Sequence, residues 1–299
     1  MLDLNRLRAL DALAKCGTVH AAAIALHCTP SAISQQLAKL ERETGTVLCE
    51  KDGRGLRLTD AGRLLAASAV TVFQEVERAE AALAAHHAVV GGRVTIATFA
   101  TGCRALLPAA LVSLHESHPA LATSLLELNP YEAMSALNRG EADVAVVDDW
   151  PEVSLALPAG LSYVELGIDT ADLIVPSDHA LAKAERVTLE HVRDERWIAS
   201  PPGTICHDWL MRVLPGLEAD YLVGEFETQL TLIAAGLGVA LIPRLARNGL
   251  PQGCVAVPVR PIPKRRVMVV WRTSSEARPA VMTTVDAMRQ AWATHQRGR

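Results

Sequence analysis

The sequence holds few residues whose types and spacing suit metal binding. His115-Glu116-Ser117-His118 is one residue short of the zinc-protease pattern H-E-x-x-H and is typical of a helix end before Pro119. Cys206 and His207 are adjacent, so their side chains diverge on a helix. The cysteines, at positions 16, 28, 49, 103, 206 and 254, form no C-x-x-C pair, which indicates neither a zinc site nor a disulfide framework. We therefore expect no metal and no cofactor.

The motifs of common enzyme classes are missing from the sequence as well. It has no phosphate-binding loop and no G-x-S-x-G nucleophile turn. Gly236-Leu237-Gly238 lacks the third glycine of a dinucleotide-binding loop. An enzyme with an N-terminal appendage is one alternative, but these absences favour a protein that is not an enzyme.

One predicted helix, over residues 30–44, carries polar groups that suit DNA. Ser31, Ser34 and Gln35 fall on one face, and apolar side chains line another. The amide of a glutamine can pair with N6 and N7 of adenine in the major groove, and hydroxyls suit phosphate oxygens. This face is therefore a candidate surface for reading DNA.

The elements around this helix form a compact module. Leucines at 4, 7, 10 and 13 predict a helix over residues 4–15, and a second helix covers 19–27. Thr29 suits the N-cap of the third helix, and Pro30 suits its first position. Three short helices with a tight turn between the last two predict a helix-turn-helix. Asp52-Gly53 between two short apolar stretches predicts a hairpin, which completes a winged helix-turn-helix.

A long helix, from Asp60 to about His87, follows the predicted hairpin. Its apolar positions recur at alternating steps of four and three, which is a coiled-coil seam and favours dimerisation. The alternative is a helix packed on its own domain. The seam positions are Leu65, Ala69, Val72, Val76, Ala79, Leu83, His86 and Val90.

Beyond Gly91-Gly92, the best linker candidate, predicted strands and helices alternate. This alternation predicts an α/β fold, and its length favours two lobes with a cleft between them. The predicted strands are 94–98, 121–128, 144–147, 172–175, 196–199, 222–226, 254–257 and 267–272, and the predicted helices are 102–117, 131–139, 188–194, 206–214, 228–235, 239–247 and 279–295.

Composition and charge fit this organisation. The chain has 299 residues, of which 50% are hydrophobic and 21% charged, and this excludes a disordered protein. Residues 1–63 carry a net charge of +2 and the remainder −6, so any contact with a polyanion belongs to the N-terminal module. The sequence shows no apolar run long enough to span a bilayer and no signal peptide, and the cysteine usage is that of a reduced compartment, so we expect a cytoplasmic protein.

The N-terminal motifs resemble the signature of LysR-type transcriptional regulators. The resemblance runs from Thr18 to Leu37, and continues through Leu40-Glu41, Gly45, Leu48 and Leu58-Thr59-Asp60-Ala61-Gly62. Residues 137–146 and 234–243 resemble two weaker marks of the same family. Two positions depart from the family pattern, because Cys49 stands where Phe is common and Lys51 where Arg is usual.

The resemblance implies three parts. These are a winged helix-turn-helix DNA-binding domain (1–59), a linker and dimerisation helix with a hinge (60–91), and an effector-binding domain (92–299) like a periplasmic binding protein. The effector domain is expected to have lobe I at about 92–165 and 267–299, and lobe II at about 166–266.

The resemblance also implies which residues bind DNA. The N-terminal residues of the recognition helix enter the major groove, and basic residues of the wing contact the backbone or the minor groove. For each of them the alternative is a solvated surface residue. The expected DNA-binding residues are Thr29, Pro30, Ser31, Ser34, Gln35, Lys39, Lys51, Arg54 and Arg57.

The effector cleft is expected at strand ends and helix N-termini. The sequence leaves the charge of the effector open, because Asp148, Asp149 and Glu227 favour a cation whereas helix N-termini favour an anion. Cys206 resembles the reactive cysteine of peroxide-sensing members, but no second cysteine lies close in sequence. The expected effector-binding residues are Thr98, Phe99, Thr101, Asp148, Ser200, Thr204, Phe226 and Glu227.

The expected function is therefore transcriptional regulation by sequence-specific binding to a promoter inverted repeat, controlled by a small-molecule effector. The expected assembly is a homodimer through residues 60–90, and a homotetramer of two such dimers. RNA polymerase is a further possible partner, and no membrane is expected. The alternative is a nucleoid-associated or architectural DNA-binding protein without effector control.

Overall fold

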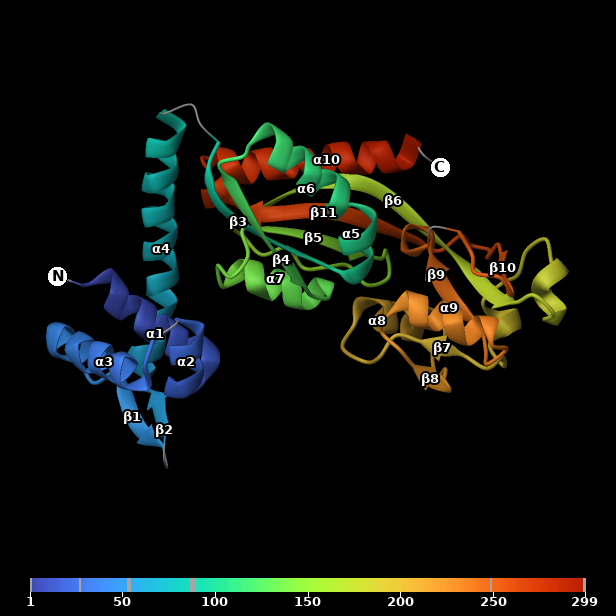
Figure 1. Cartoon of the computed structure of the whole chain (residues 1–299). Helices are drawn as coiled ribbons and strands as arrows, with labels where there is room; N and C mark the ends of the chain where they lie inside the picture. Colours follow the sequence, from blue (N-terminus) through green and yellow to red (C-terminus); the bar gives the residue numbers. More distant parts are fainter. Residues whose placement is uncertain (1, 27, 53–54, 87–89, 248, 298–299) are drawn as a thin grey trace. The chain divides into compact units, whose positions relative to one another are not determined.

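The computed structural model describes residues 2–26, 28–52, 55–86, 90–247 and 249–297. Residues 1–83 and 84–299 form two compact units (Figure 1). No helix of the described residues is long and apolar enough to cross a membrane.

The first unit begins with three short helices: α1 (Leu4–Cys16), α2 (Val19–Ala25) and α3 (Pro30–Thr44). Each begins at a capping side chain that accepts a hydrogen bond from the first helical turn, as Thr29 does from the backbone N–H of Ala32 at 3.2 Å. Gly45 ends α3 with φ 62°, a left-handed conformation that suits glycine. Buried leucines of α1 and α3, with Ile33 of α3 and the alanines Ala22 and Ala23 of α2, form the core of this unit, which confirms the predicted helix-turn-helix.

The wing consists of the antiparallel strands β1 (Cys49–Asp52) and β2 (Gly55–Leu58). Glu41 of α3 fixes its start, because one carboxylate oxygen accepts from the backbone N–H groups of Leu48 (2.8 Å) and Cys49 (3.0 Å). Gly62 is required at the base of the wing, since a Cβ there would lie 2.1 Å from the carbonyl oxygen of Leu48.

The helix α4 (Asp60–His86) follows the wing. Its first turns pack on the helix-turn-helix, where Ala69 is buried and Leu65 is half-buried. Val72 and Leu83 are exposed, the latter by 67%. The predicted seam is therefore divided: its start belongs to the core of the module, Val72, Ala79 and Leu83 are exposed, and Val90 lies beyond the helix.

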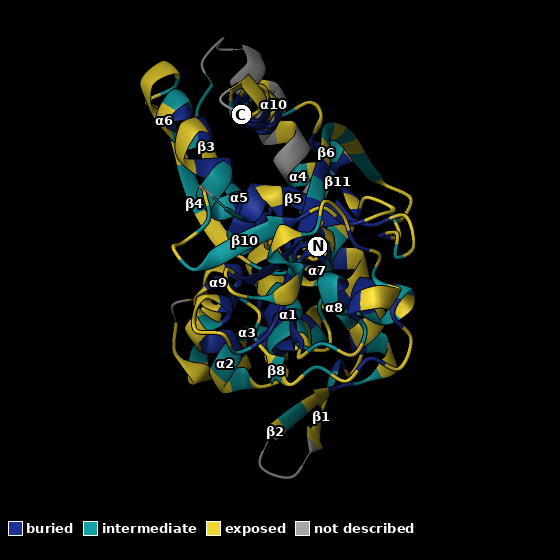
Figure 2. Ribbon diagram, turned by 90° about the vertical axis from the view of Figure 1, so that its right-hand side faces the viewer, coloured by how far each residue is buried: buried dark blue, intermediate teal, exposed yellow. Residues whose placement is uncertain are grey.

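The second unit is built on a seven-stranded sheet in the order β10-β6-β11-β5-β3-β4, with β9 also paired to β6. The strands β3 (Gly92–Thr98), β4 (Leu121–Glu127) and β5 (Val144–Asp149) are parallel to one another, and β11 (Lys264–Arg272) joins β5 antiparallel. Helices α6 (Leu107–Ser117) and α10 (Pro279–Arg297) cover one face, and α7 (Pro130–Asn138) covers the other (Figure 1). Every residue of β5 is buried, as the dark blue strands in Figure 2 show.

One long strand, β6 (Leu161–Pro176), connects the two lobes. Its first part pairs with β11, and its last part pairs with β9 (Ala240–Pro243) and β10 (Cys254–Val257). The second lobe adds α8 (Ile205–Val213), α9 (Phe226–Ala234) and the short pair β7 (Ile198–Ala199) and β8 (Tyr221–Leu222). The predicted two-lobed α/β architecture is confirmed.

Several predicted elements of this unit were wrong in type or length. The segment 239–247 is not a helix, because it forms β9 and the 3-10 turn Arg244–Ala246, and its apolar residues pair with β6. The predicted helix 188–194 is only the 3-10 turn Glu190–Val192. The predicted helix 102–117 is two helices, α5 (Ala100–Ala105) and α6, because the chain bends at Leu106 before Pro108. The strands predicted over 196–199 and 222–226 are reduced to Ile198–Ala199 and Tyr221–Leu222, because α9 begins at Phe226.

Candidate DNA-binding surface and effector cavity

The candidate DNA-reading face of α3 is exposed to solvent. Ser31, Ser34, Gln35 and Lys39 are all exposed, whereas the apolar face of the helix is buried. The side chain of Gln35 makes no hydrogen bond to any residue that the structure describes, so both its donor and its acceptor are available.

The hydroxyls beside Gln35 have local partners. Thr29 and Ser31 share a hydrogen bond of 2.9 Å between their hydroxyls, and the hydroxyl of Ser34 donates to the carbonyl of Pro30 at 3.1 Å. These bonds hold the hydroxyls in fixed directions at the first turn of α3, where the backbone N–H groups also favour a phosphate.

The wing presents its basic residues unequally. Lys51 is exposed, and Arg57 is exposed but paired with Glu50, whose carboxylate oxygen lies 2.6 Å from Nη2 of Arg57. Arg54, another expected contact, lies outside the described residues. Arg57 can therefore contact DNA only if a phosphate displaces the carboxylate of Glu50.

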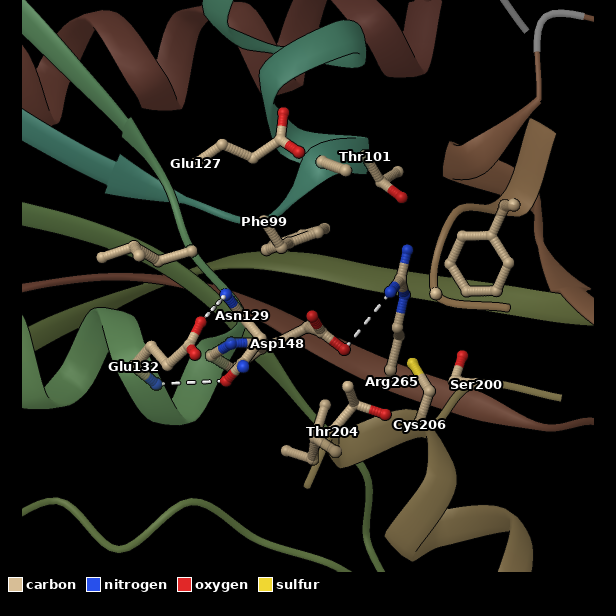
Figure 3. Close-up of a pocket in the computed structure, with 16 residues that line it drawn as sticks. Phe99, Thr101, Glu127, Asn129, Glu132, Asp148, Ser200, Thr204, Cys206 and Arg265 are labelled. Atoms are coloured by element: carbon tan, nitrogen blue, oxygen red, sulfur yellow. Dashed lines mark hydrogen bonds and ion pairs between the residues drawn. The ribbon is translucent and has the colours of Figure 1, made fainter. Parts of the chain in front are cut away.

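The second unit contains a cavity of about 250 Å³ between its lobes. Helices α5, α7, α8 and α9 direct their N-terminal ends at it, and β5 and β11 contribute Asp148 and Arg265 (Figure 3). The lining residues are Phe99, Ala100, Thr101, Glu127, Leu128, Asn129, Pro130, Glu132, Asp148, Ser200, Thr204, Ile205, Cys206, Gly224, Phe226 and Arg265.

Two of the expected effector-binding residues do not line this cavity. Thr98 is fully buried beneath α5, where a Cβ on Gly102 would lie only 2.3 Å from its hydroxyl oxygen. Glu227 is 65% exposed and pairs with Arg104, whose Nε lies 3.3 Å from the carboxylate. The remaining expected residues, Phe99, Thr101, Asp148, Ser200, Thr204 and Phe226, all lie in the cavity wall.

A buried ion network crosses the wall of the cavity. The guanidinium of Arg265 is 1% exposed and lies between two carboxylates, 3.2 Å from Asp148 and 2.9 Å from Asp169. The aromatic ring of Phe99 covers the guanidinium, with the ring centre 5.2 Å from the central carbon. Burial raises the pKa of the Asp148 carboxyl, although Arg265 opposes this shift. The network joins β5, β6 and β11, the strands on which both lobes are built.

Asp149, the neighbour of Asp148, does not face the cavity. Both of its carboxylate oxygens accept from Arg266, at 2.9 and 2.7 Å. This bidentate pair neutralises Asp149, so the residue no longer argues for a cationic effector as the sequence suggested.

Cys206 occupies the first turn of α8 and faces the cavity (Figure 3). Burial raises the pKa of its thiol to about 12, and the nearby carboxylate of Asp148 adds to this effect. The thiol is therefore protonated at neutral pH. Beyond it, Trp150 and Trp209 stack with ring centres 4.1 Å apart.

Sequence reasoning missed Arg265 and the acidic rim of the cavity. Arg265 stands between two other basic residues, Lys264 and Arg266, a pattern typical of a solvated turn. Glu127 ends β4, and Asn129 and Glu132 form a capping box at the start of α7, which the order Asn-Pro-x-Glu does indicate.

Comparison with known proteins assigns both units. Residues 4–63 match the family described as bacterial regulatory helix-turn-helix protein, lysR family, and residues 87–293 match the LysR substrate binding domain. A protein of Dickeya chrysanthemi described as hydrogen peroxide-inducible genes activator is 28% identical over 98% of this chain and 97% of its own. The transcriptional regulator MetR of Escherichia coli is 29% identical over 81% of this chain and 75% of its own.

Solved structures share the fold. A full-length OxyR variant from Pseudomonas aeruginosa superposes with a TM-score of 0.74 at 22% identity, covering 97% of this chain and 98% of that one. Full-length CbnR in complex with its target DNA superposes with a TM-score of 0.57 at 21% identity, covering 97% and 99%. LysR-type regulators bind DNA and small effectors and form oligomers, and they are not enzymes. With a family helix-turn-helix at one end and a family effector domain over the rest, this chain is a LysR-type transcriptional regulator.

Proposed function

We propose that the protein binds a promoter inverted repeat as a homodimer or a homotetramer, and that a small molecule in the cavity of the second unit changes this binding. The observation that carries the proposal is the cavity itself. Its wall includes the buried residues Thr101 and Ser200, whose hydroxyls make no hydrogen bond to any described residue. A polar ligand would satisfy them.

Direct reading of the DNA falls to Gln35 in this proposal. Its free amide can form two hydrogen bonds to adenine, while Thr29, Ser31, Ser34 and Lys39 contact phosphate, and Pro30 offers an apolar surface. Lys51, Arg54 and Arg57 add contacts from the wing. Thr98 and Glu227 are left out of the effector site, since neither reaches the cavity.

Dimerisation through α4 is supported by the apolar side chains that its own module leaves uncovered. Leu64, Val72 and Leu83 are exposed by 72%, 38% and 67% along this helix. A second copy of the helix would remove these side chains from water, which is favourable in proportion to the apolar area buried. In this proposal RNA polymerase is a further partner. The protein is proposed to act in the cytoplasm.

The effector would act through the strands that the lobes share. A ligand that contacts both Thr101 in the first lobe and Ser200 in the second shifts the angle between the lobes only by its different affinity for the two arrangements. In a tetramer this would change the spacing of the two DNA-binding pairs and hence the bend of the DNA.

A second candidate is peroxide sensing, since several relatives are described as hydrogen peroxide-inducible genes activators and Cys206 faces the cavity. The thiolate is the form that reacts with peroxide, and a pKa of about 12 leaves almost none of it at neutral pH. Mass spectrometry after peroxide treatment separates the two candidates, because the first predicts an unmodified Cys206 and the second an oxidised one.

The experiment that tests the main proposal is genome-wide DNA binding by the purified protein at near-physiological salt, followed by footprinting of the strongest site with and without metabolite fractions. A protected inverted repeat whose footprint changes with one fraction is the expected result. Diffuse binding without a motif would overturn the proposal and favour an architectural protein.

A further inference from the structure

We propose that the effector is a small cation that carries an apolar group. Its positive charge lies against Asp148, and its apolar part lies against the aromatic walls formed by Phe99 and Phe226. This inference rests on the proposed function, because it names the class of ligand for the same cavity.

The hydroxyls of two buried residues, Thr101 and Ser200, can donate or accept hydrogen bonds in the cavity. Thr101 is 1% exposed and Ser200 is 7% exposed, and both lie in the wall (Figure 3). Neither hydroxyl has a hydrogen-bond partner within the described residues. Both residues line the cavity, so each hydroxyl is open to a polar group of a ligand or to the water that the ligand would displace.

The balance of charge around the cavity is negative. Glu127, Glu132 and Asp148 line it, against the single base Arg265. That base is shared between Asp148 and the equally buried Asp169. The guanidinium is therefore more than neutralised, and the wall as a whole attracts a cation.

Asp148 offers a free oxygen to the ligand. Its Oδ2 accepts from Arg265 at 3.2 Å, while Oδ1 has no hydrogen bond to the described part of the chain. Figure 3 shows one oxygen of Asp148 joined to Arg265 by a dashed line and the other without such a line. Burial raises the pKa of this carboxyl, and an ammonium group beside it would favour the charged form, since little water screens the attraction at a side chain that is 1% exposed.

Three of the four helix N-termini at the cavity, which would otherwise favour an anion, are capped by side chains of the protein, and only the six-residue α5 has no side-chain cap. Asn129 and Glu132 form a capping box on α7, and Thr204 caps α8. Glu225 caps α9, where its carboxylate accepts from two backbone N–H groups at 2.7 and 3.1 Å. On α7 and α9 a carboxylate of the chain thus stands at the N-terminus, so an anionic ligand would meet like charge.

Cys206 provides a direct measurement of the cavity's charge, because its thiol faces the cavity. Methanethiosulfonate reagents transfer an alkylthio group to a thiol and release methanesulfinate, and they exist in cationic (aminoethyl), anionic (sulfonatoethyl) and neutral (methyl) forms. Peptide mass mapping of the whole protein gives the rate at each cysteine, so no cysteine needs to be replaced. The ratio of cationic to anionic rates at exposed Cys28 serves as the internal reference.

We expect this ratio to be at least about tenfold larger at Cys206 than at Cys28, because a charged cavity concentrates the reagent of opposite sign. Asp148→Asn should reduce the ratio toward that of Cys28. Glu227→Gln is the matched control: it also removes one negative charge, but outside the cavity, and should leave the ratio unchanged. The wild-type ratio stands by itself if the Asn variant does not fold.

Ligand competition gives a second, independent readout. Phenethylammonium should protect Cys206 from the neutral reagent, and 3-phenylpropionate, of similar shape, should not. Faster reaction with the anionic reagent, or protection by the carboxylate alone, would overturn the cationic class but leave the cavity as an effector site. If Cys206 reacts too slowly to follow, because its pKa is about 12, calorimetric titration of the whole protein with the same two compounds replaces the labelling, and binding of 3-phenylpropionate alone overturns the cationic class. Failure of the proposed function would appear separately, as a footprint that no metabolite fraction alters.

Discussion

The DNA-reading face of α3 and the effector cavity use similar polar residues, but they hold them in different ways. On α3 the hydroxyls of Thr29, Ser31 and Ser34 are exposed and bonded to partners at most four residues away. In the cavity Arg265 and Asp148 are buried and bonded to each other across the chain, although they are 117 residues apart. The polar side chains of the first site lie on the surface of α3, and the helix does not need them in order to fold. The second site is part of what holds its unit together.

Replacing the buried guanidinium should give the largest effect and test this contrast most directly. Arg265→Met would leave the carboxylates of Asp148 and Asp169 buried without a counter-charge, which typically costs about 3–5 kcal/mol. Denaturant unfolding monitored by tryptophan fluorescence would measure it, because all five tryptophans lie in the second unit. Arg193→Met is the control, since its partner Glu190 is 71% exposed and no buried charge is left behind, so the loss should be much smaller. Equal losses would show that the cavity network has no special structural role.

Replacing Gln35 should do the opposite and change binding without changing stability. Gln35→Ala removes an amide that has no partner in the described protein, so the unfolding free energy should stay the same. Affinity for the cognate site should fall by about 1–3 kcal/mol, with little loss on scrambled DNA. Fluorescence anisotropy with the two duplexes measures both. Lys39→Ala provides the comparison, because losing a phosphate contact should weaken both complexes alike.

The same contrast explains what could be predicted from the sequence. The three helices of the first unit were predicted, the third with its N-cap Thr29, because periodicity and capping are local properties of the chain. The segment 239–247 was predicted as a helix, but Val239 to Pro243 is also an apolar run that suits a strand, and only its pairing with β6 decides. Arg265 was missed for the same reason, since it is buried only after β11 lies between β5 and β6.

Part of the cavity was still predictable, because strand ends and helix N-termini meet at the edge of such a fold. This rule placed Phe99, Asp148 and Thr204 correctly in the wall. It placed Glu227 there too, although the first turn of α9 directs that side chain to Arg104 instead. Position at the end of an element thus gives the neighbourhood of a site, and the direction of each side chain has to come from the packed structure.

A second ion cluster shows whether long-range charge pairs hold the whole unit or only the cavity. Asp172 of β6 is bonded to Arg244 and to Arg247, beyond β9. Burial of its carboxyl opposes ionisation, but the two guanidinium groups together outweigh burial and lower the pKa below its usual 3.8. Because the pKa is lower in the folded state than in the unfolded state, ionised Asp172 stabilises the fold at any pH above its unfolded-state pKa. This stabilisation is lost as the pH falls below that pKa and toward the folded-state value. Asp172→Asn should therefore cost about 1.5 kcal/mol at pH 7 and progressively less below pH 4.

Urea unfolding of wild type and variant across this pH range measures the difference. A gap between the two proteins that stays constant down to pH 2 would contradict the assignment. In that case the loss would come from packing or from the neutral hydrogen bonds of the side chain, because neither depends on ionisation.

The smallest expected effect on stability lies in the ion pair of the wing. Glu50 and Arg57 form an ion pair on an exposed strand pair, and such pairs contribute at most about 1 kcal/mol because water screens them. Glu50→Gln should therefore leave unfolding almost unchanged. It should nevertheless strengthen binding to every DNA sequence a few-fold, because it frees Arg57 for phosphate and removes a negative charge near the backbone.

In the double variant with Arg57→Ala, the part of this gain that comes from freeing Arg57 should disappear. Anisotropy titrations over a range of salt concentrations separate the two contributions, since an added phosphate contact steepens the salt dependence by about one unit. An unchanged salt slope would assign Arg57 to the structure of the wing, and the wing would then resemble the cavity, with its charges serving the fold before they serve a ligand.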